Sequence, residues 1–281
     1  MNLTGKIALV TGANAGIGLE ACVKIAKAGA TLYMVARDAK RGAAAVEQVK
    51  RRSGNQQVSL LLCDFASQKS IRAHAAEVLA KLPRLDLLVN NAGLVSDTRQ
   101  VTEDGFERTF AVNHLGYFLL TNLLLDRIVQ SAPARIVNVA SAAHFHGDMD
   151  FENLQYEKGG YFVMRSYARS KLGNVLFTAE LARRLEGKRV TVNSLHPGAV
   201  ATEIWNNAPW YAKPLIPIAR LFMLSVEEGG DRIVQLAMDP ALEGLTGGYY
   251  QRRKLTKTAT LARDEALAKR LWDVSAQLVK L

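Results

Sequence analysis

Tyr167 and Lys171 stand four positions apart in the segment Tyr-Ala-Arg-Ser-Lys, which places a phenol and an ammonium group on one face of a helix. A phenol is protonated at neutral pH and is a weak base. A neighbouring cation favours the ionised phenol and brings its pKa closer to the working range. The pair therefore predicts a general acid/base. The same spacing also arises by chance, so its meaning depends on what lies beside it.

Two further polar residues are candidates for the same site. Ser141 follows the apolar run 136–139, which predicts a buried strand and places the hydroxyl at the carboxyl edge of a sheet. Asn113 lies in the mostly apolar run 109–125, which predicts a buried helix. These positions give Asn113, Ser141, Tyr167 and Lys171 as the catalytic candidates.

A glycine-rich turn separates a predicted strand at 7–10 from an amphipathic helix at 16–28. Such a turn lets the backbone approach a pyrophosphate closely and directs amide groups at a helix N-terminus toward negative charge. Glycines also collect in turns for steric reasons alone. The strand before the turn and the helix after it favour dinucleotide binding through the residues Gly12, Asn14, Gly16, Ile17 and Gly18.

The end of the second predicted strand indicates which dinucleotide binds. An acidic residue there would grip the ribose 2′-hydroxyl and repel a 2′-phosphate, but the chain has Ala36 at that position, followed by Arg37. The planar guanidinium of an arginine can chelate a phosphate, which predicts NADP(H). The alternative is a solvated Arg37 at a strand end. We expect Asp38 to cap the following helix.

The chain as a whole resembles the short-chain dehydrogenase/reductase family. The glycines follow the spacing Gly-x-x-x-Gly-x-Gly, the segment 90–93 reads Asn-Asn-Ala-Gly, and the four catalytic candidates occur in the family order. Ser141 and Tyr167 are 26 residues apart, a long separation. Together with the segments 113–121, 170–177 and 270–273, it resembles the retinol-dehydrogenase-like branch.

This resemblance implies a role for each catalytic candidate. In carbonyl reduction Tyr167 gives a proton to the carbonyl oxygen, while Ser141 hydrogen-bonds that oxygen. Lys171 lowers the pKa of the tyrosine and holds the nicotinamide ribose. Asn113 orients a water. Besides Tyr167 and Lys171, further cofactor contacts are implied for Asp64, Asn91, Ala92, Gly93, Pro197, Gly198, Val200 and Thr202.

Two of these assignments have structural alternatives. Asp64 follows the third predicted strand, where the resemblance implies contact with the adenine amino group, but an aspartate there can equally cap the next helix. In the Asn-Asn-Ala-Gly segment, Asn90 is expected to tie neighbouring strands together.

Alternating runs predict an α/β fold, a single Rossmann-type doubly wound parallel sheet of about seven strands with helices on both faces. The strands are expected at 7–10, 32–35, 58–62, 85–89, 136–139, 190–195 and near 249–250, and the helices at 16–28, 39–52, 68–81, 102–131, 165–186 and 261–279. No linker interrupts this rhythm, so residues 1–281 form one domain. The weakly periodic segments 142–164 and 199–225 are expected to be substrate-side loops or a lid.

Composition excludes several classes of protein. The chain has 281 residues, 49% of them hydrophobic, which excludes disorder, and two cysteines, Cys22 and Cys63, which excludes a disulfide framework. The histidines are too dispersed for a metal site, and His144 and His146 are expected to be a loop pair. No apolar run is long enough to span a bilayer, and the first residues show neither a signal nor an anchor. We therefore expect a cytoplasmic protein.

The net charge of +10 is compatible with a phosphate-bearing ligand, nucleic acid or an anionic membrane. No nucleic-acid motif supports the second class. Segment 204–226 is an apolar lid, a pair of packed helices or a weak peripheral membrane contact. The resemblance also implies a homo-dimer or tetramer built on the long helices around 113–126 and 167–184.

The predicted function is interconversion of a carbonyl and an alcohol on a hydrophobic small molecule, with NADP(H) as cofactor and Tyr167 as general acid/base. The alternative is a non-catalytic NADP(H)-binding regulatory protein on the same fold.

Overall fold

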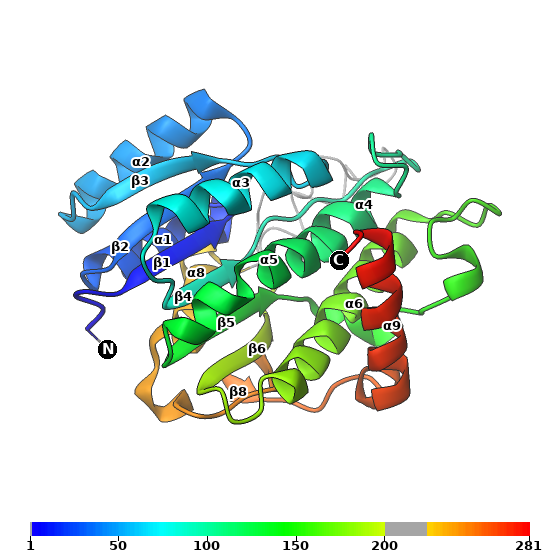
Figure 1. Ribbon diagram of the computed structural model, residues 1–281. Helices are drawn as coiled ribbons and strands as arrows, with labels where there is room; N and C mark the ends of the chain where they lie inside the picture. Colours follow the sequence, from blue (N-terminus) through cyan, green and yellow to red (C-terminus); the bar gives the residue numbers. More distant parts are fainter. Residues whose placement is uncertain (1, 200–223) are drawn as a thin grey trace.

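A computed structural model of the chain describes residues 2–199 and 224–281 (Figure 1). In these ranges eight strands form one sheet, in the order β3-β2-β1-β4-β5-β6-β7-β8. Strands β1 to β7 pair in parallel, and β8 pairs antiparallel with β7. The strands are β1 (Ile7–Thr11), β2 (Thr31–Ala36), β3 (Val58–Leu62), β4 (Leu87–Asn90), β5 (Ala134–Val139), β6 (Val190–His196), β7 (Tyr249–Gln251) and β8 (Lys254–Leu255).

The strand order reverses between β1 and β4, and this topological switch positions the site. From β1 the chain moves outward to β2 and β3, then returns to pair β4 with the other side of β1. In open α/β sheets ligands bind at such a reversal, outside the carboxyl ends of the strands. The expectation of a doubly wound parallel sheet is confirmed, with one short antiparallel strand added at its edge.

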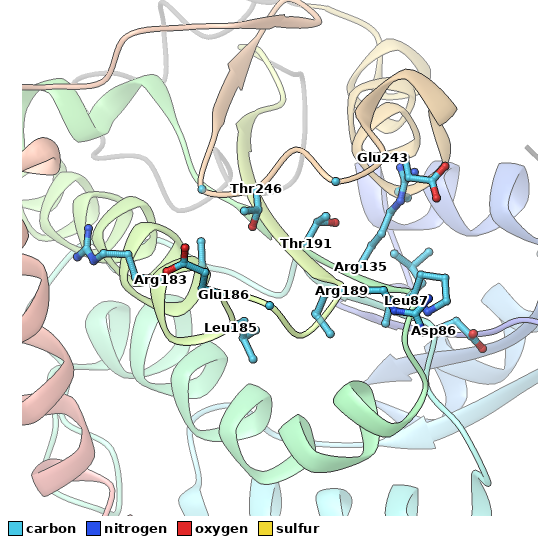
Figure 2. Close-up of a pocket in the computed structure, with 18 of the residues that line it drawn as sticks. Asp86, Leu87, Arg135, Arg183, Leu185, Glu186, Arg189, Thr191, Glu243 and Thr246 are labelled. Carbon is cyan, nitrogen blue, oxygen red and sulfur yellow. The ribbon is translucent and has the colours of Figure 1, made fainter.

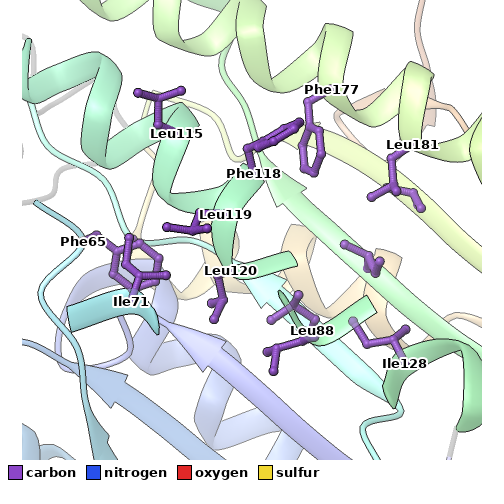
Figure 3. Packing of buried hydrophobic residues seen from close by; sticks show 14 of the residues in the cluster. Phe65, Ile71, Leu88, Leu115, Phe118, Leu119, Leu120, Ile128, Phe177 and Leu181 are labelled. Carbon is purple, nitrogen blue, oxygen red and sulfur yellow. The ribbon is translucent and has the colours of Figure 1, made fainter. Parts of the chain in front are cut away.

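Helices cover both faces of the sheet (Figure 1). One face carries α1 (Gly16–Lys27), α2 (Ala39–Ser53) and α8 (Val226–Met238). The other carries α3 (Gln68–Lys81), α5 (Gly116–Gln130), α6 (Val163–Arg184) and α9 (Glu265–Leu278). Each layer buries an apolar core against the sheet, and Figure 3 shows Phe118 and Phe177 meeting in the second one. This burial is the main favourable term in folding.

Helix α9 packs on α5 and α6. Trp272 lies 4.9 Å from the ring of Phe118 and 5.8 Å from that of Phe177, measured between ring centroids, and the Arg184 guanidinium lies 4.1 Å over the Trp272 ring. The resemblance implies dimers or tetramers through these same two helices, and α9 covers part of their surface.

The helix expected at 102–131 is interrupted. Helical structure begins only at α4 (Arg108–Phe110), because the buried Glu107 carboxylate accepts the amide hydrogens of Thr109 and Phe110 and caps the helix. A π-helix (Ala111–Leu115) then precedes α5. Such widened turns occur frequently at functional sites.

Helix α8 was not predicted, although its start carries a local signal. The Ser225 side chain accepts the Glu228 amide hydrogen, and the Glu228 carboxylate accepts the Ser225 amide hydrogen, which completes a capping box. The expectation that Asp38 caps the following helix is confirmed. Asp38 caps α2 by accepting the Arg41 amide hydrogen, and Cys22 and Cys63 are buried free thiols whose pKa is raised by burial.

Within the described ranges, no helix combines the length and apolar character that a membrane span needs. The same residues contain no group of three or more His, Cys, Asp or Glu side chains placed to hold a metal ion.

Candidate active site

A cavity of about 710 Å³ opens at the carboxyl edge of the sheet, at the switch point. It brings together residues that are far apart in the sequence, from the glycine turn to the segment after β6. The predicted site residues that line it are Gly12, Asn14, Gly16, Ile17, Arg37, Asp64, Asn91, Ala92, Gly93, Ser141, Tyr167, Lys171, Pro197 and Gly198.

The glycine turn folds tightly against β4. Gly12 has a φ of +62°, and a Cβ atom there would lie 2.7 Å from the Ala92 Cα. Gly18 does not line the cavity, because it packs inward, where a Cβ atom would lie 2.4 Å from both the Asn91 Nδ2 and the Gly12 carbonyl oxygen. Gly18 therefore lets α1 approach the sheet, while Gly16 and Ile17 face the cavity.

Helix α1 presents its N-terminus to this cavity without a side-chain cap. Its N-cap residue is Ala15, whose side chain makes no capping hydrogen bond. The first amide groups of a helix have no partner inside the helix and carry the positive end of its dipole. The glycine turn and the uncapped N-terminus of α1 together form a site that fits a phosphate group.

A set of hydrogen bonds holds β1 against the segment that follows β4. The Thr11 hydroxyl donates to the Val89 carbonyl and accepts the amide hydrogens of Asn91 and Ala92. In return the Asn91 side-chain amide donates to the carbonyls of Thr11 and Gly12. The Asn91 side chain thus holds the backbone of the glycine turn in place.

The neighbouring Asn90 is structural, as expected. Its side-chain amide donates to the Thr121 hydroxyl, at 2.9 Å, and to the Asn138 side-chain oxygen, also at 2.9 Å. The second contact joins β4 to β5 within the core.

Arg37 and Asp64 lie at the β2 and β3 end of the cavity. Within residues 2–199 and 224–281 the exposed Arg37 guanidinium makes no hydrogen bond or ion pair. Asp64 accepts the Ala66 amide hydrogen, and Ser67, not Asp64, caps α3. The helix-cap alternative for Asp64 is therefore wrong.

Ser141 and Tyr167 meet at the other end of the cavity. The Ser141 hydroxyl oxygen accepts the Ala143 amide hydrogen at 3.1 Å, so its own proton remains free to be donated. Burial raises the pKa of Tyr167, and a hydrogen bond with Ser141 opposes that shift. The sequence predicts that Lys171 lowers this pKa. That role of Lys171 stays a prediction.

Lys171 lies beneath the tyrosine, one helical turn along α6. Its Nζ donates to the Val139 carbonyl at 2.9 Å and lies 5.6 Å from the centroid of the Tyr167 ring. Burial lowers the pKa of Lys171 to about 7. The ammonium group can therefore bind and release a proton near neutral pH.

Asn113 lies in the π-helix and does not line the cavity. Its side-chain oxygen accepts the Leu94 amide hydrogen, while its Nδ2 donates to the Leu94 carbonyl and to the Ser170 hydroxyl. Asn113 thus connects the strand edge after β4 to α6 between Tyr167 and Lys171. Its expected role in orienting a water stays a prediction.

Two of the predicted cofactor contacts, Val200 and Thr202, lie outside the described residues, as does nearly all of the predicted segment 199–225. The segment 142–164 is described, and its two ends line the cavity through Ala142, Ala143, His146 and Met164. His144 is buried instead, with Nδ1 at 2.7 Å from the Ser141 carbonyl oxygen.

The apolar wall of the cavity was predicted only in part, because the predicted loop 142–164 includes Ala142, Ala143 and Met164 but not Leu94 and Val95. It is formed by the residues Leu94, Val95, Ala142, Ala143 and Met164. Phe145 and Phe162, which neighbour some of these residues in the sequence, leave 44% and 54% of their surface exposed. No local pattern marks these residues, because exposed apolar side chains in irregular segments have no periodicity to detect.

A second cavity, of about 800 Å³, lies at the opposite, amino edge of the sheet (Figure 2). Two of its charged residues, Asp86 and Arg135, have structural partners. Asp86 accepts hydrogen bonds from Lys6 Nζ and from the Ile7 amide, and Arg135 donates to the carbonyls of Leu236 and Asp239. None of the predicted site residues lines it.

Comparisons with known proteins agree with this geometry. The family model for short chain dehydrogenase matches residues 6–210. Human retinol dehydrogenase 13 is 42% identical over 99% of this chain and 86% of its own length, and human retinol dehydrogenase 11 is 42% identical over 100% and 88%.

Among solved structures, an uncharacterised protein from Mycobacterium paratuberculosis superposes with a TM-score of 0.80 at 30% identity, covering 99% of this chain and 95% of that one. The catalytic candidates, the switch-point cavity and these matches lead to one conclusion: this chain belongs to the short-chain dehydrogenase/reductase family, in its retinol-dehydrogenase-like branch.

Proposed function

We propose that the protein is an NADP(H)-dependent oxidoreductase that interconverts a carbonyl and an alcohol on an apolar small molecule. The observation that carries this proposal is the convergence of Ser141, Tyr167 and Lys171 at the wall of a cavity that also receives the uncapped N-terminus of α1. Phosphate-binding and proton-transfer groups thus share one site.

The residues at the β1–β4 switch point fit a dinucleotide. The backbone around Gly16 and Ile17 would hold the pyrophosphate, and Arg37 would meet a 2′-phosphate beyond β2. Lys171 would hold the nicotinamide ribose. When bound, the nicotinamide supplies or accepts a hydride.

Three side chains then take part in proton transfer and in stabilising the charge that develops on the substrate oxygen. Tyr167 donates its phenolic proton to a substrate oxygen in reduction and takes it back in oxidation. Ser141 contributes the hydroxyl proton that its contact with Ala143 leaves free, and this proton stabilises negative charge on the same oxygen. Lys171, whose pKa is near 7, restores the proton to Tyr167 at neutral pH.

The substrate side of the cavity favours an apolar molecule. Leu94, Val95 and Met164 line it. The relatives with the matching sequence are retinol dehydrogenases, so a retinoid or another long apolar aldehyde or alcohol is the proposed substrate class.

The Arg37→Asp variant tests the cofactor assignment. Replacing the guanidinium with a carboxylate removes a charge-assisted contact and adds repulsion, so Kd for NADPH should rise about 10- to 100-fold. Kd for NADH should change little. Arg51→Asp, the same change on exposed α2, is the matched control. An equal effect on both cofactors would refute the 2′-phosphate contact.

A non-catalytic NADP(H)-binding regulator remains the alternative on this fold. A cofactor titration followed by a panel of aldehydes and ketones separates the two functions. Turnover of any apolar aldehyde with NADPH supports the proposed enzyme, whereas tight NADPH binding without turnover across the panel supports the regulator.

A further inference from the structure

The segment between Ser141 and Tyr167 is closed tightly onto helix α6. A short 3-10 helix (Ala142–His146) begins directly after Ser141, and Gly147 follows it. A Cβ atom on Gly147 would lie 2.7 Å from the Ala168 carbonyl oxygen and 2.8 Å from the Leu172 Cβ. The chain therefore touches the α6 backbone between the tyrosine and the lysine of the site.

Arg169, which stands between Tyr167 and Lys171, holds this segment in place. Its side chain is only 1% exposed, and its Nε donates to Asp148 Oδ1 at 2.8 Å. Its Nη1 donates to the carbonyls of Asn153, at 2.7 Å, and Leu154, at 3.0 Å.

The guanidinium plane of Arg169 also lies 4.2 Å from the centroid of the buried Tyr156 ring. One buried cation therefore fixes residues 148 to 156 at four points.

The buried charge and the planar shape of the Arg169 side chain make these contacts specific to arginine. A buried cation is costly unless it is paired and hydrogen-bonded, so Arg169 requires this segment to stay where it is. Burial alone would raise the pKa of Asp148, but hydrogen bonds from Arg169 and Arg165 outweigh it and hold the pKa below its ordinary value. A lysine has neither the planar fork nor the stacking surface to replace these contacts.

The same segment orients a hydrogen-bond donor of the site, the Ser141 hydroxyl. Ser141 caps the 3-10 helix by accepting the Ala143 amide hydrogen, and the far end of that helix leads through Gly147 to Asp148. Ala143 and His146, which line the cavity, lie between these two anchors.

We infer that Arg169 is a positioning residue for the reaction: by holding Asp148 and the 153–154 carbonyls it fixes residues 142–148 as a rigid wall of the substrate site and sets the direction of the Ser141 hydroxyl. This inference deepens the proposed function and rests on it for the reaction itself. It makes the described segment 142–164 a fixed wall and not a lid.

The Arg169→Lys and Asp148→Ala variants test this inference. In each, kcat for aldehyde reduction should fall about 10- to 100-fold, because displacing the Ser141 hydroxyl by about 1 Å weakens its hydrogen bond to the reacting oxygen and loses that much rate. Kd for NADPH should stay within about 2-fold, since the phosphate-binding turn is untouched. Asp148, whose side chain is 32% exposed, gives a second variant that removes the ion pair without changing a residue of α6, if Arg169→Lys does not fold.

Amide hydrogen exchange provides a readout that needs no substrate. In both variants residues 142–156 should exchange faster, while the β1–α1 turn should exchange as in the original chain. Arg183→Lys is the control, because Arg183 also pairs with an acid, Glu180, and lies at the amino-edge cavity instead of the carboxyl-edge cavity. It should change neither rate nor exchange.

The outcomes separate the inference from the proposed function. If the original chain reduces no aldehyde, the proposed function fails. Faster amide exchange at 142–156 in the variants would still support the inference that Arg169 holds this segment in place. If folded Arg169→Lys and Asp148→Ala keep the original exchange and kcat, Arg169 does not position the site and the inference is overturned.

Discussion

The two edges of one sheet carry cavities of similar size and different chemistry. The amino-edge cavity, about 800 Å³, is the larger, and the carboxyl-edge cavity has about 710 Å³. At the amino edge Asp86 and Arg135 have structural partners. At the carboxyl edge the Ser141 proton, the Tyr167 phenol and the α1 N-terminus converge on open space. The arrangement of these polar groups, and not the volume of the cavity, marks the carboxyl edge as the candidate active site.

The largest effect should come from Tyr167→Phe at the carboxyl edge. Removing the phenolic oxygen removes the proton donor, so kcat should fall about 10²- to 10⁴-fold. The ring remains, so Kd for NADPH should be nearly unchanged in a fluorescence titration. A variant with near-original kcat would break the assignment of this edge as the active site.

Asp86→Asn tests the amino edge, where the effect should be on stability. The carboxylate accepts the Ile7 amide hydrogen and pairs with Lys6, so its neutralisation should lower the free energy of unfolding by about 1–3 kcal/mol. The measurement is denaturant unfolding, with kcat as the control. A loss of kcat without a loss of stability would contradict the contrast between the edges.

The effect of Asp86→Asn on the free energy of unfolding should depend on pH. Burial alone would raise the pKa of Asp86, but hydrogen bonds from Arg84, the Ile7 amide and Lys6 outweigh it and lower that pKa below the ordinary 3.8. The stabilisation is therefore complete above pH 3.8 and is lost as the pH falls through the lower, folded-state pKa. The stability difference between Asp86→Asn and the original chain should shrink only in that acidic range.

The smallest effect should come from Glu186→Gln, an exposed position that lines the amino-edge cavity (Figure 2). Stability should change by no more than about 0.5 kcal/mol, and kcat should not change. A clear change in substrate KM would show that the amino-edge cavity takes part in the reaction.

Local sequence patterns predicted the elements that position the site. The glycine turn, the strand ends at Ser141 and Arg37, and the Tyr167–Lys171 spacing each depend on a few neighbouring residues, and the cavity contains them all. The alternation of strands and helices predicted a doubly wound parallel sheet but not the order of its strands, which the structure gives.

Contacts between distant segments escaped prediction. The Arg169 contacts with Asp148 and with the Asn153 carbonyl join parts of the chain whose approach no local pattern encodes. The π-helix around Asn113 is similar, since its side chain bonds to Leu94 and Ser170 across three elements. In both cases tertiary packing selects a geometry that local propensity leaves open.

The most direct test of the central claim is transfer of deuterium from NADPH deuterated at nicotinamide C4 to an apolar aldehyde such as a retinal. The account predicts deuterium on the carbinol carbon of the alcohol product with the original chain, and about 10²- to 10⁴-fold slower transfer with Tyr167→Phe. NADPH that binds tightly and is oxidised by no aldehyde in the panel would contradict it.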